Sequence, residues 1–175
     1  MKKKFLLGIA CYYHDSSACL LGDGEILNAV QEERFTRIKN DSSFPTNSIK
    51  FILKKNLIKL ADIDAIIFYE KPFLKFERLI ETYLAFAPKG FTSFARAMPI
   101  WIKDKLFQKS FLIKKLNETL GNKVNWGERL LFSEHHLSHA ASAFYPSPFK
   151  RAAILTLDGV GEWSTSSICV GDNSN

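Results

Sequence analysis

The first thirty residues constrain the fold more than any other part of the chain. Residues 5–11 and 17–21 are short apolar runs rich in strand-forming side chains, and the sequence Gly22-Asp23-Gly24-Glu25 follows the second run. Asp-Gly is typical of a hairpin turn, and residues 26–30 form a third run of the same kind. We therefore expect a three-stranded antiparallel meander. A polar loop between its first two strands is a place where a ligand can bind.

The segments after the meander predict an α/β class. Two consecutive isoleucines within residues 63–68 favour a strand that is buried on both faces, as in a parallel sheet. Before that strand we expect a helix that Ser48 caps and that runs to about Asn56. After residue 127 the pattern predicts a strand at 129–132, a helix at 135–144 stopped by prolines, and two paired strands at 152–157 and 164–170.

Residues 70–127 have a different character. Apolar side chains recur there at helical spacing, many of them among the 15 phenylalanines of the chain, in the segments 73–86, 91–107 and 111–120. This spacing predicts a helical insertion, in which the apolar positions form a packed helix face. The alternative is that the aromatic side chains form a surface for a partner.

Composition excludes several classes of protein. The 24 basic residues exceed the 18 acidic ones, but they are scattered through apolar helical segments, which indicates solvated helix faces and no nucleic-acid partner. No apolar run approaches the roughly 20 residues of a membrane span. Three cysteines without C-x-x-C spacing favour a reducing, cytoplasmic location. The basic N-terminal residues and the apolar run after them are similar to a secretory signal peptide, but the apolar run is too short for one.

Three of the four histidines lie within five residues, at 135–139. On a helix, His135 and His139 are one turn apart and leave the same face, which is the spacing at which one helix supplies two ligands to a transition metal. The zinc-protease pattern H-E-x-x-H is absent because His136 stands where its glutamate would be. The alternative is that both histidines are polar surface residues.

Asp158 is a candidate third ligand. It ends an apolar strand and begins a glycine-rich turn with Gly159 and Gly161. Ligands collect at the carboxyl ends of strands in α/β sheets, and glycines there let phosphate oxygens approach the backbone. Two histidines and one carboxylate suit Fe(II), Zn(II) or Mn(II) with open positions for phosphate or water. The alternative is an ordinary turn aspartate.

The loop of the first hairpin holds another candidate site. His14 is able to act as a general base or a phosphate ligand, and Asp15 is able to orient it. A simple turn built by the Asp and Ser side chains of residues 15–17 is the alternative. Further along, residues 32–39 place acidic and basic side chains together on an expected strand end and loop, which makes them a further candidate functional segment. The alternative is that these side chains form a solvated cluster of salt bridges.

Four segments, at residues 13–18, 32–39, 135–140 and 157–162, together resemble the nodulation-protein type of O-carbamoyltransferase, which includes antibiotic-tailoring enzymes. The resemblance implies the first lobe of an actin-like ATPase (ribonuclease H-like) domain, similar to the protein that forms threonylcarbamoyladenosine in tRNA. It spans about residues 5–170. In domain terms, residues 1–175 are expected to be this first lobe, with residues 70–127 as the helical insertion.

The resemblance also implies a reaction. Carbamoyl phosphate and ATP form carbamoyl adenylate, and the actin-like domain passes the carbamoyl group to a hydroxyl of a small-molecule acceptor. His135, His139 and Asp158 look like ligands of a divalent metal, Fe(II) first and Zn or Mn next, at the adenylate phosphate. His14, with Asp15, resembles the residue near the reacting hydroxyl. By the same resemblance Lys39 would face the anionic substrate. Together with Gly159 and Gly161, whose backbone phosphate oxygens are able to approach, it is the candidate set for nucleotide binding.

The chain departs from this family in length, because members also have a second lobe and a C-terminal domain that handles carbamoyl phosphate. We expect those parts to be its partners, and the 175 residues alone to be incomplete and inactive. Two other functions are open. An actin-like small-molecule kinase would share the first hairpin but does not need the histidine pair. A non-catalytic interaction module would use the Phe-rich helices but leave His14, His139 and Asp158 without a role.

Overall fold

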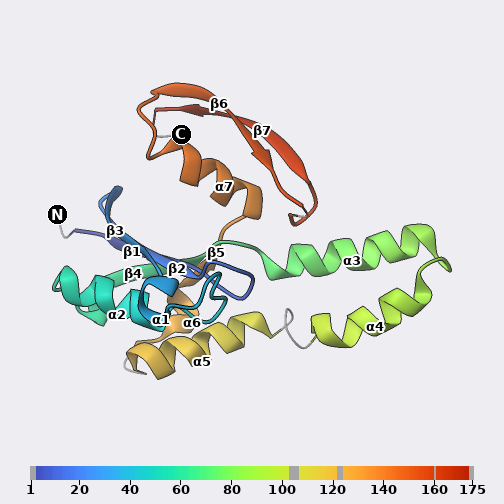
Figure 1. The fold of residues 1–175 in the computed structure, drawn as a ribbon, viewed down its shortest axis with the longest axis horizontal. Coiled ribbons are helices and arrows are strands. Elements are labelled where there is room, and N and C mark those ends of the chain that lie inside the picture. Colours follow the sequence, from blue (N-terminus) through green and yellow to red (C-terminus); the bar gives the residue numbers. More distant parts are fainter. Residues whose placement is uncertain (1–2, 103–106, 122–123, 160, 174–175) are drawn as a thin grey trace. The chain divides into compact units, whose positions relative to one another are not determined.

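The computed structural model describes residues 3–102, 107–121, 124–159 and 161–173. The chain divides into two compact units (Figure 1). Residues 1–69 and 109–132 make up the first unit, and residues 70–108 and 133–175 make up the second. We describe each unit by itself.

The first unit contains a five-stranded mixed sheet in the order β3-β2-β1-β4-β5. Its strands are β1 (Phe5–Ala10), β2 (Ser17–Gly22), β3 (Glu25–Gln31), β4 (Ile63–Phe68) and β5 (Leu130–Phe132). The pairs β1–β2 and β2–β3 are antiparallel, whereas β4 runs parallel to both β1 and β5. The predicted α/β class and its opening three-stranded meander are therefore confirmed.

Helices α2 (Thr46–Lys55) and α5 (Gln108–Leu120) cover this sheet on one side (Figure 1). Their hydroxyls meet where Thr46 Oγ1 lies 3.3 Å from Thr119 Oγ1. Strand alternation puts every second side chain of β1 into the core, and helical spacing brings apolar side chains of α2 and α5 to the same place. The fully buried side chains include Leu7, Leu20, Ile49, Ile52, Ile63, Ile66, Phe68, Leu112, Leu116 and Trp126.

The start of α2 corrects one expectation. Ser48 does not cap the helix, because α2 begins at Thr46 and Pro45 stands in the cap position without a side-chain hydrogen bond. Instead the carboxylate of buried Glu32 accepts hydrogen bonds from the backbone N–H groups of Asn47 and Ser48 and from both their side chains, at 2.7–3.0 Å. A residue distant in sequence thus satisfies the first donors of the helix.

Short helices complete the first unit. Residues 32–39, expected as a strand end and loop, contain the single-turn helix α1 (Glu33–Thr36). The 3₁₀ turn η1 (Leu60–Asp62) leads into β4, and α6 (Trp126–Arg129) leads into β5. The buried ring of Trp126 donates its indole N–H to the carbonyl of Gly121 at 3.2 Å.

The second unit contains two long helices, α3 (Pro72–Phe86) and α4 (Phe91–Trp101), the helix α7 (His135–Phe144) and the hairpin of β6 (Arg151–Leu157) and β7 (Ser166–Asp172). β6 pairs antiparallel with β7, as predicted from the sequence. Helix α7 lies along one face of this hairpin (Figure 1). There the Phe144 ring packs so close to Gly171 that a Cβ at that position would stand 2.7 Å from it.

Three helices, α3, α4 and α5, occupy most of the range 70–127 in which the helical insertion was predicted. The end of the segment predicted at 91–107 falls partly on residues 103–106, outside the described residues. The assignment of the whole chain to one lobe with this insertion stays a prediction. Among the described residues, no helix combines the length and the apolar character that a membrane crossing requires.

Candidate metal centre

Helix α7 presents two imidazoles on one face. Glu134, in extended conformation, precedes it, and the first helical residue is His135. Because four residues advance a helix by slightly more than one turn, His139 projects beside His135, with ring centroids 4.7 Å apart. The Nε2 atoms of the two rings are 3.1 Å apart. Both rings therefore direct the same nitrogen to a common point.

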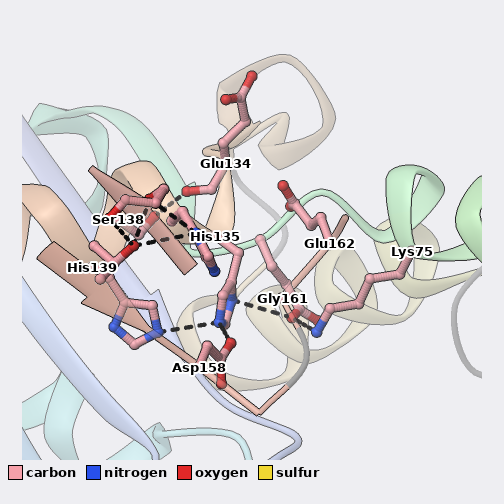
Figure 2. A network of polar contacts seen from close by, with 12 residues as sticks. Lys75, Glu134, His135, Ser138, His139, Asp158, Gly161 and Glu162 are labelled. Carbon is pink, nitrogen blue, oxygen red and sulfur yellow. Dashed lines mark hydrogen bonds and ion pairs between the residues drawn. The ribbon is translucent and has the colours of Figure 1, made fainter. Parts of the chain in front are cut away.

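Strand β6 brings a carboxylate to that point. Asp158 follows the strand, and its N–H donates to the carbonyl of Thr165 at 2.8 Å, which closes the turn to β7. Its Oδ2 lies 2.6 Å from Nε2 of His135. Figure 2 shows the His135 and His139 imidazoles and the Asp158 carboxylate pointing toward one another. One ligand atom from each of the three residues lies within 4.8 Å of the other two.

The three side chains differ in exposure and charge. His135 is 9% exposed, whereas His139 is exposed. Desolvation lowers the pKa of His139, and the charge of His135 lowers it further. For Asp158, desolvation raises the pKa, but the hydrogen bond and charge of His135 outweigh it and the net pKa is below its ordinary value. The cluster thus favours an ionised carboxylate beside a neutral His139, which are the forms that bind a metal.

These donors fit a divalent transition metal. Ligand atoms about 2.1 Å from one ion are separated from each other by about 3–4 Å, so small side-chain rotations suffice to bring all three to it. Two imidazole nitrogens and one carboxylate oxygen leave further coordination positions open for water or phosphate.

Helix α3 holds the turn that carries Asp158. The Arg78 guanidinium donates to the carbonyl of Gly161 at 2.6 Å, and the buried Glu162 carboxylate accepts the backbone N–H of Lys71. A Cβ on Gly161 would stand 2.7 Å from the Ser164 carbonyl oxygen, whereas a Cβ on Gly159 would meet no atom within 4 Å. Gly161 is therefore required by packing, and Gly159 leaves room beside Asp158.

His136 belongs to a different set of contacts. Its Nδ1 lies 3.0 Å from Ser167 Oγ and 3.2 Å from Thr156 Oγ1. This imidazole therefore connects α7 to β6 and β7, and it does not join the three convergent side chains.

Sequence reasoning missed two charged residues of this cluster. Glu70 is 1% exposed, its Oε2 lies 3.8 Å from Nδ1 of His135, and Lys75 forms an ion pair with the same oxygen. The sequence did contain a signal for Glu70. It is a glutamate that follows the buried strand β4 by two residues, and a charged side chain so close to an apolar core is unusual.

The remaining predicted residues lie in the first unit. Nδ1 of His14 is 2.7 Å from Oδ2 of Asp15, and the two side chains are 60% and 39% exposed. Tyr12 and Asp15 have positive φ angles of 72° and 51°, so this loop is tightly curved. Lys39 is exposed. The predicted site residues thus form two groups, one in each unit.

Fold and site together define a mixed α/β protein with a cluster of two histidines and one aspartate at the end of a strand. The family model described as "Carbamoyltransferase N-terminus" matches residues 5–175, and the chain belongs to this family. The "Uncharacterized protein sll1178" of Synechocystis is 56% identical over 97% of this chain and 28% of its own length. "Nodulation protein NolNO" of Sinorhizobium fredii is 33% identical over 93% of this chain and 22% of its own.

The chain therefore spans about a quarter of the length of these relatives. Among solved structures, "YeaZ from Pseudomonas aeruginosa" is similar over 87% of this chain and 54% of its own, with 16% identity and a TM-score of 0.38. The similarity to the nodulation protein confirms the resemblance to nodulation-type carbamoyltransferases that the sequence motifs indicated. The solved structure is too distant to add to the assignment.

Proposed function

We propose that the chain is the N-terminal part of an O-carbamoyltransferase. The enzyme would take a carbamoyl group from carbamoyl phosphate, through an ATP-derived carbamoyl adenylate, to a hydroxyl of a small-molecule acceptor. Membership of the carbamoyltransferase N-terminus family supports the transfer of a carbamoyl group. The convergence of His135, His139 and Asp158 is the observation that supports metal-assisted chemistry in this chain.

The transfer step needs a base. The acceptor oxygen attacks the carbamoyl carbon, the bond between that carbon and the adenylate phosphate oxygen breaks, AMP leaves, and the acceptor gives up its proton. His14 suits this role because its Nδ1 lies 2.7 Å from the Asp15 side chain, and a hydrogen bond donated by Nδ1 leaves Nε2 to accept a proton. Both side chains are exposed enough for an acceptor to approach.

The leaving group needs charge stabilisation. A divalent ion bound by His135, His139 and Asp158 would neutralise negative charge that develops on the phosphate of AMP. Fe(II) is our first candidate and Zn(II) or Mn(II) the next, because imidazole and carboxylate donors suit all three. The open surroundings of Gly159 leave the backbone accessible to phosphate oxygens. Lys39 would attract the anionic substrate.

The test is anaerobic titration of the purified chain with Fe(II), Zn(II) and Mn(II), beside the variants His139→Ala and Asp158→Ala. We expect one ion per chain, with affinity reduced at least tenfold in each variant. His136→Gln is the matched control, since it removes a neighbouring imidazole that contacts Ser167 and Thr156 instead. Its affinity should stay within about threefold of the unchanged protein.

The nucleotide provides a second readout. AMP should bind more tightly to the metal-loaded chain than to the metal-free chain, and Asp158→Ala should abolish the difference. Metal binding that survives in both ligand variants would contradict the site. Stoichiometric metal with no effect on AMP affinity would contradict its role at the adenylate phosphate.

A further inference from the structure

The excess positive charge of the chain lies in one segment of the first unit. Of the 24 basic and 18 acidic residues, residues 34–61 contain seven and one, which leaves 17 of each in the rest of the chain. The acidic residue, Asp41, is 6% exposed. A solvated helix face usually mixes charges of both signs, so this segment is unusual. All seven basic side chains are exposed: Arg34, Arg37, Lys39, Lys50, Lys54, Lys55 and Lys59.

Helices α1 and α2 bring part of this charge together with aromatic side chains. The rings of Phe35 on α1 and Phe51 on α2 lie 5.5 Å apart, so the two helices are side by side (Figure 1). Lys50 and Lys54 are exposed one turn apart on α2. Nζ of Lys55 lies 5.7 Å from the centroid of the Phe51 ring. Three lysines therefore flank the exposed edge of an aromatic pair.

A leucine at the end of α2 adds to these apolar side chains. Leu57 is 91% exposed and has a positive φ of 54°. The N–H of Ile58 donates to the carbonyl of Leu53 at 3.1 Å, which is the helix ending in which glycine usually takes the position of Leu57. A positive φ is unfavourable for leucine, and this side chain gains almost no burial within the chain to offset it. A contact outside the chain would explain why leucine stands there.

We propose that these side chains form a basic surface that binds an anionic lipid membrane as a peripheral contact. The lysine ammonium groups would reach the lipid phosphates, while Leu57 and the exposed parts of both rings enter the boundary between headgroups and acyl chains. Such a contact needs no membrane-spanning helix. It also does not depend on the proposed carbamoyl transfer or its metal. The basic surface consists of Phe35, Lys50, Phe51, Lys54, Lys55 and Leu57.

The charge and the aromatic contacts favour lipid over other partners. A second copy of the chain would present the same positive charge, so two such surfaces would repel each other. Single-stranded nucleic acids stack their bases on open aromatic rings. Here the Phe35 and Phe51 rings contact each other, and Lys55 lies over Phe51. An exposed leucine would also have no role on a phosphate backbone.

The experiment measures co-sedimentation of the purified chain with phosphatidylcholine vesicles, with and without one quarter phosphatidylglycerol. We expect binding to the vesicles that contain phosphatidylglycerol, and this binding should weaken as the salt concentration rises. The combined variant Lys50→Gln, Lys54→Gln, Lys55→Gln should bind at least about tenfold more weakly.

The matched control removes three lysines elsewhere. Lys89, Lys109 and Lys150 are exposed, and replacing all three by glutamine changes the net charge by the same amount. The vesicle affinity of this control should stay within about threefold of the unchanged protein, because its basic surface is intact. Urea unfolding shows whether each combined variant is folded. Should the first one fail to fold, Lys54→Gln alone is expected to weaken binding about threefold.

Leu57→Asn separates membrane binding from folding. Asparagine tolerates a positive φ, so urea unfolding should show a stability no lower than that of the unchanged protein. The vesicle affinity should nevertheless fall at least about threefold, because an apolar side chain is lost from the contact. A leucine that served only the fold would give the opposite pattern.

Four results would overturn the inference. The first is no binding that depends on phosphatidylglycerol, and the second is an equal loss in the combined lysine variant and its matched control, which would reflect net charge alone. The third is an unchanged vesicle affinity of Leu57→Asn. The fourth is tighter binding to a single-stranded RNA than to the vesicles, lost in the combined lysine variant, which would assign the surface to nucleic acid instead.

Discussion

At the scale of single residues, the buried carboxylate of Asp41 is held by two hydrogen-bond donors. Asp41, 6% exposed, accepts the Thr36 hydroxyl at 2.7 Å and the Ser43 N–H at 2.8 Å. Its own carbonyl accepts the N–H of Ser16, in the loop that carries His14 and Asp15. Hydrogen bonds from Thr36 and Ser43 lower the pKa of Asp41 below its ordinary value of 3.8.

This pKa predicts acid sensitivity. Because the pKa is lower in the folded chain, the unfolded chain binds more protons as the pH falls. The stabilisation by Asp41 is therefore fully present well above pH 3.8 and is lost as the pH falls through the lower pKa of the folded chain. We expect Asp41→Asn to destabilise the protein by about 2 kcal/mol near neutral pH and by much less at a pH well below 3.8. Urea unfolding at both pH values measures this, with Glu25→Gln on an exposed strand position as control. If the difference in unfolding free energy between Asp41→Asn and the unchanged protein did not depend on pH, the prediction that the Asp41 carboxylate stabilises the fold would be wrong.

The two glycines of the β6–β7 turn provide a matched pair. Gly161→Ala should move the turn, because the new Cβ meets a backbone oxygen at 2.7 Å that cannot give way easily. Overpacking of this kind costs about 1–3 kcal/mol, and we expect Zn(II) affinity to fall about tenfold as Asp158 shifts. Gly159→Ala, with no atom within 4 Å, should change affinity little. Equal effects of the two substitutions would show that the turn does not position Asp158.

At the scale of elements, the first turn of α2 depends on Glu32 from outside the helix. This carboxylate is 1% exposed and accepts four hydrogen bonds, so removing its charge leaves buried donors without a full partner. We expect Glu32→Gln to destabilise the protein by about 2–4 kcal/mol, measured by urea unfolding. Glu33→Gln, one residue on and partly exposed, should cost less than about 1 kcal/mol. Equal costs would mean that α2 does not need this anchor.

At the scale of the whole molecule, the two units bury very different amounts of apolar surface. Among the described residues, the buried apolar cluster lies in the first unit, whereas Ala140 and Phe144 of the second unit are buried outside that cluster. The hairpin β6–β7 also exposes Leu155, Leu157, Ile168 and Val170 on one face. A two-stranded sheet is marginally stable alone, so the second unit should open more easily than the first.

Hydrogen exchange tests this difference. We expect amides of β1, β2 and β4 to be the most protected, and those of β6, β7 and α7 to exchange faster. A metal bound as proposed by α7 and the end of β6 would stabilise the folded form by about 2.7 kcal/mol at a free metal concentration of about 100 times its dissociation constant. Saturating Zn(II) should therefore slow exchange in the second unit of the unchanged protein but not of His139→Ala. Uniform protection without metal would contradict the prediction.

Local patterns in the sequence determined most of the secondary structure. Alternating apolar residues and the Asp23-Gly24 turn specified the meander, because strand and turn preferences act between neighbours. Helical spacing placed His135 and His139 on one face, and the position of Asp158 at a strand end marked it as a candidate ligand. The cap of α2 could not be predicted, because Glu32 reaches that helix only after the chain has folded.

The tertiary structure alone decided which distant residues meet. The contact of Glu70 with His135 joins a residue just after β4 to one at the start of α7, and Lys75 lies near both only because α3 begins there. No local preference encodes such a contact, since it depends on how the buried surfaces pack. The sequence by itself determined the types of the three candidate side chains and their spacing on α7 and after β6. Packing decided that these side chains converge and which buried charge lies beside them.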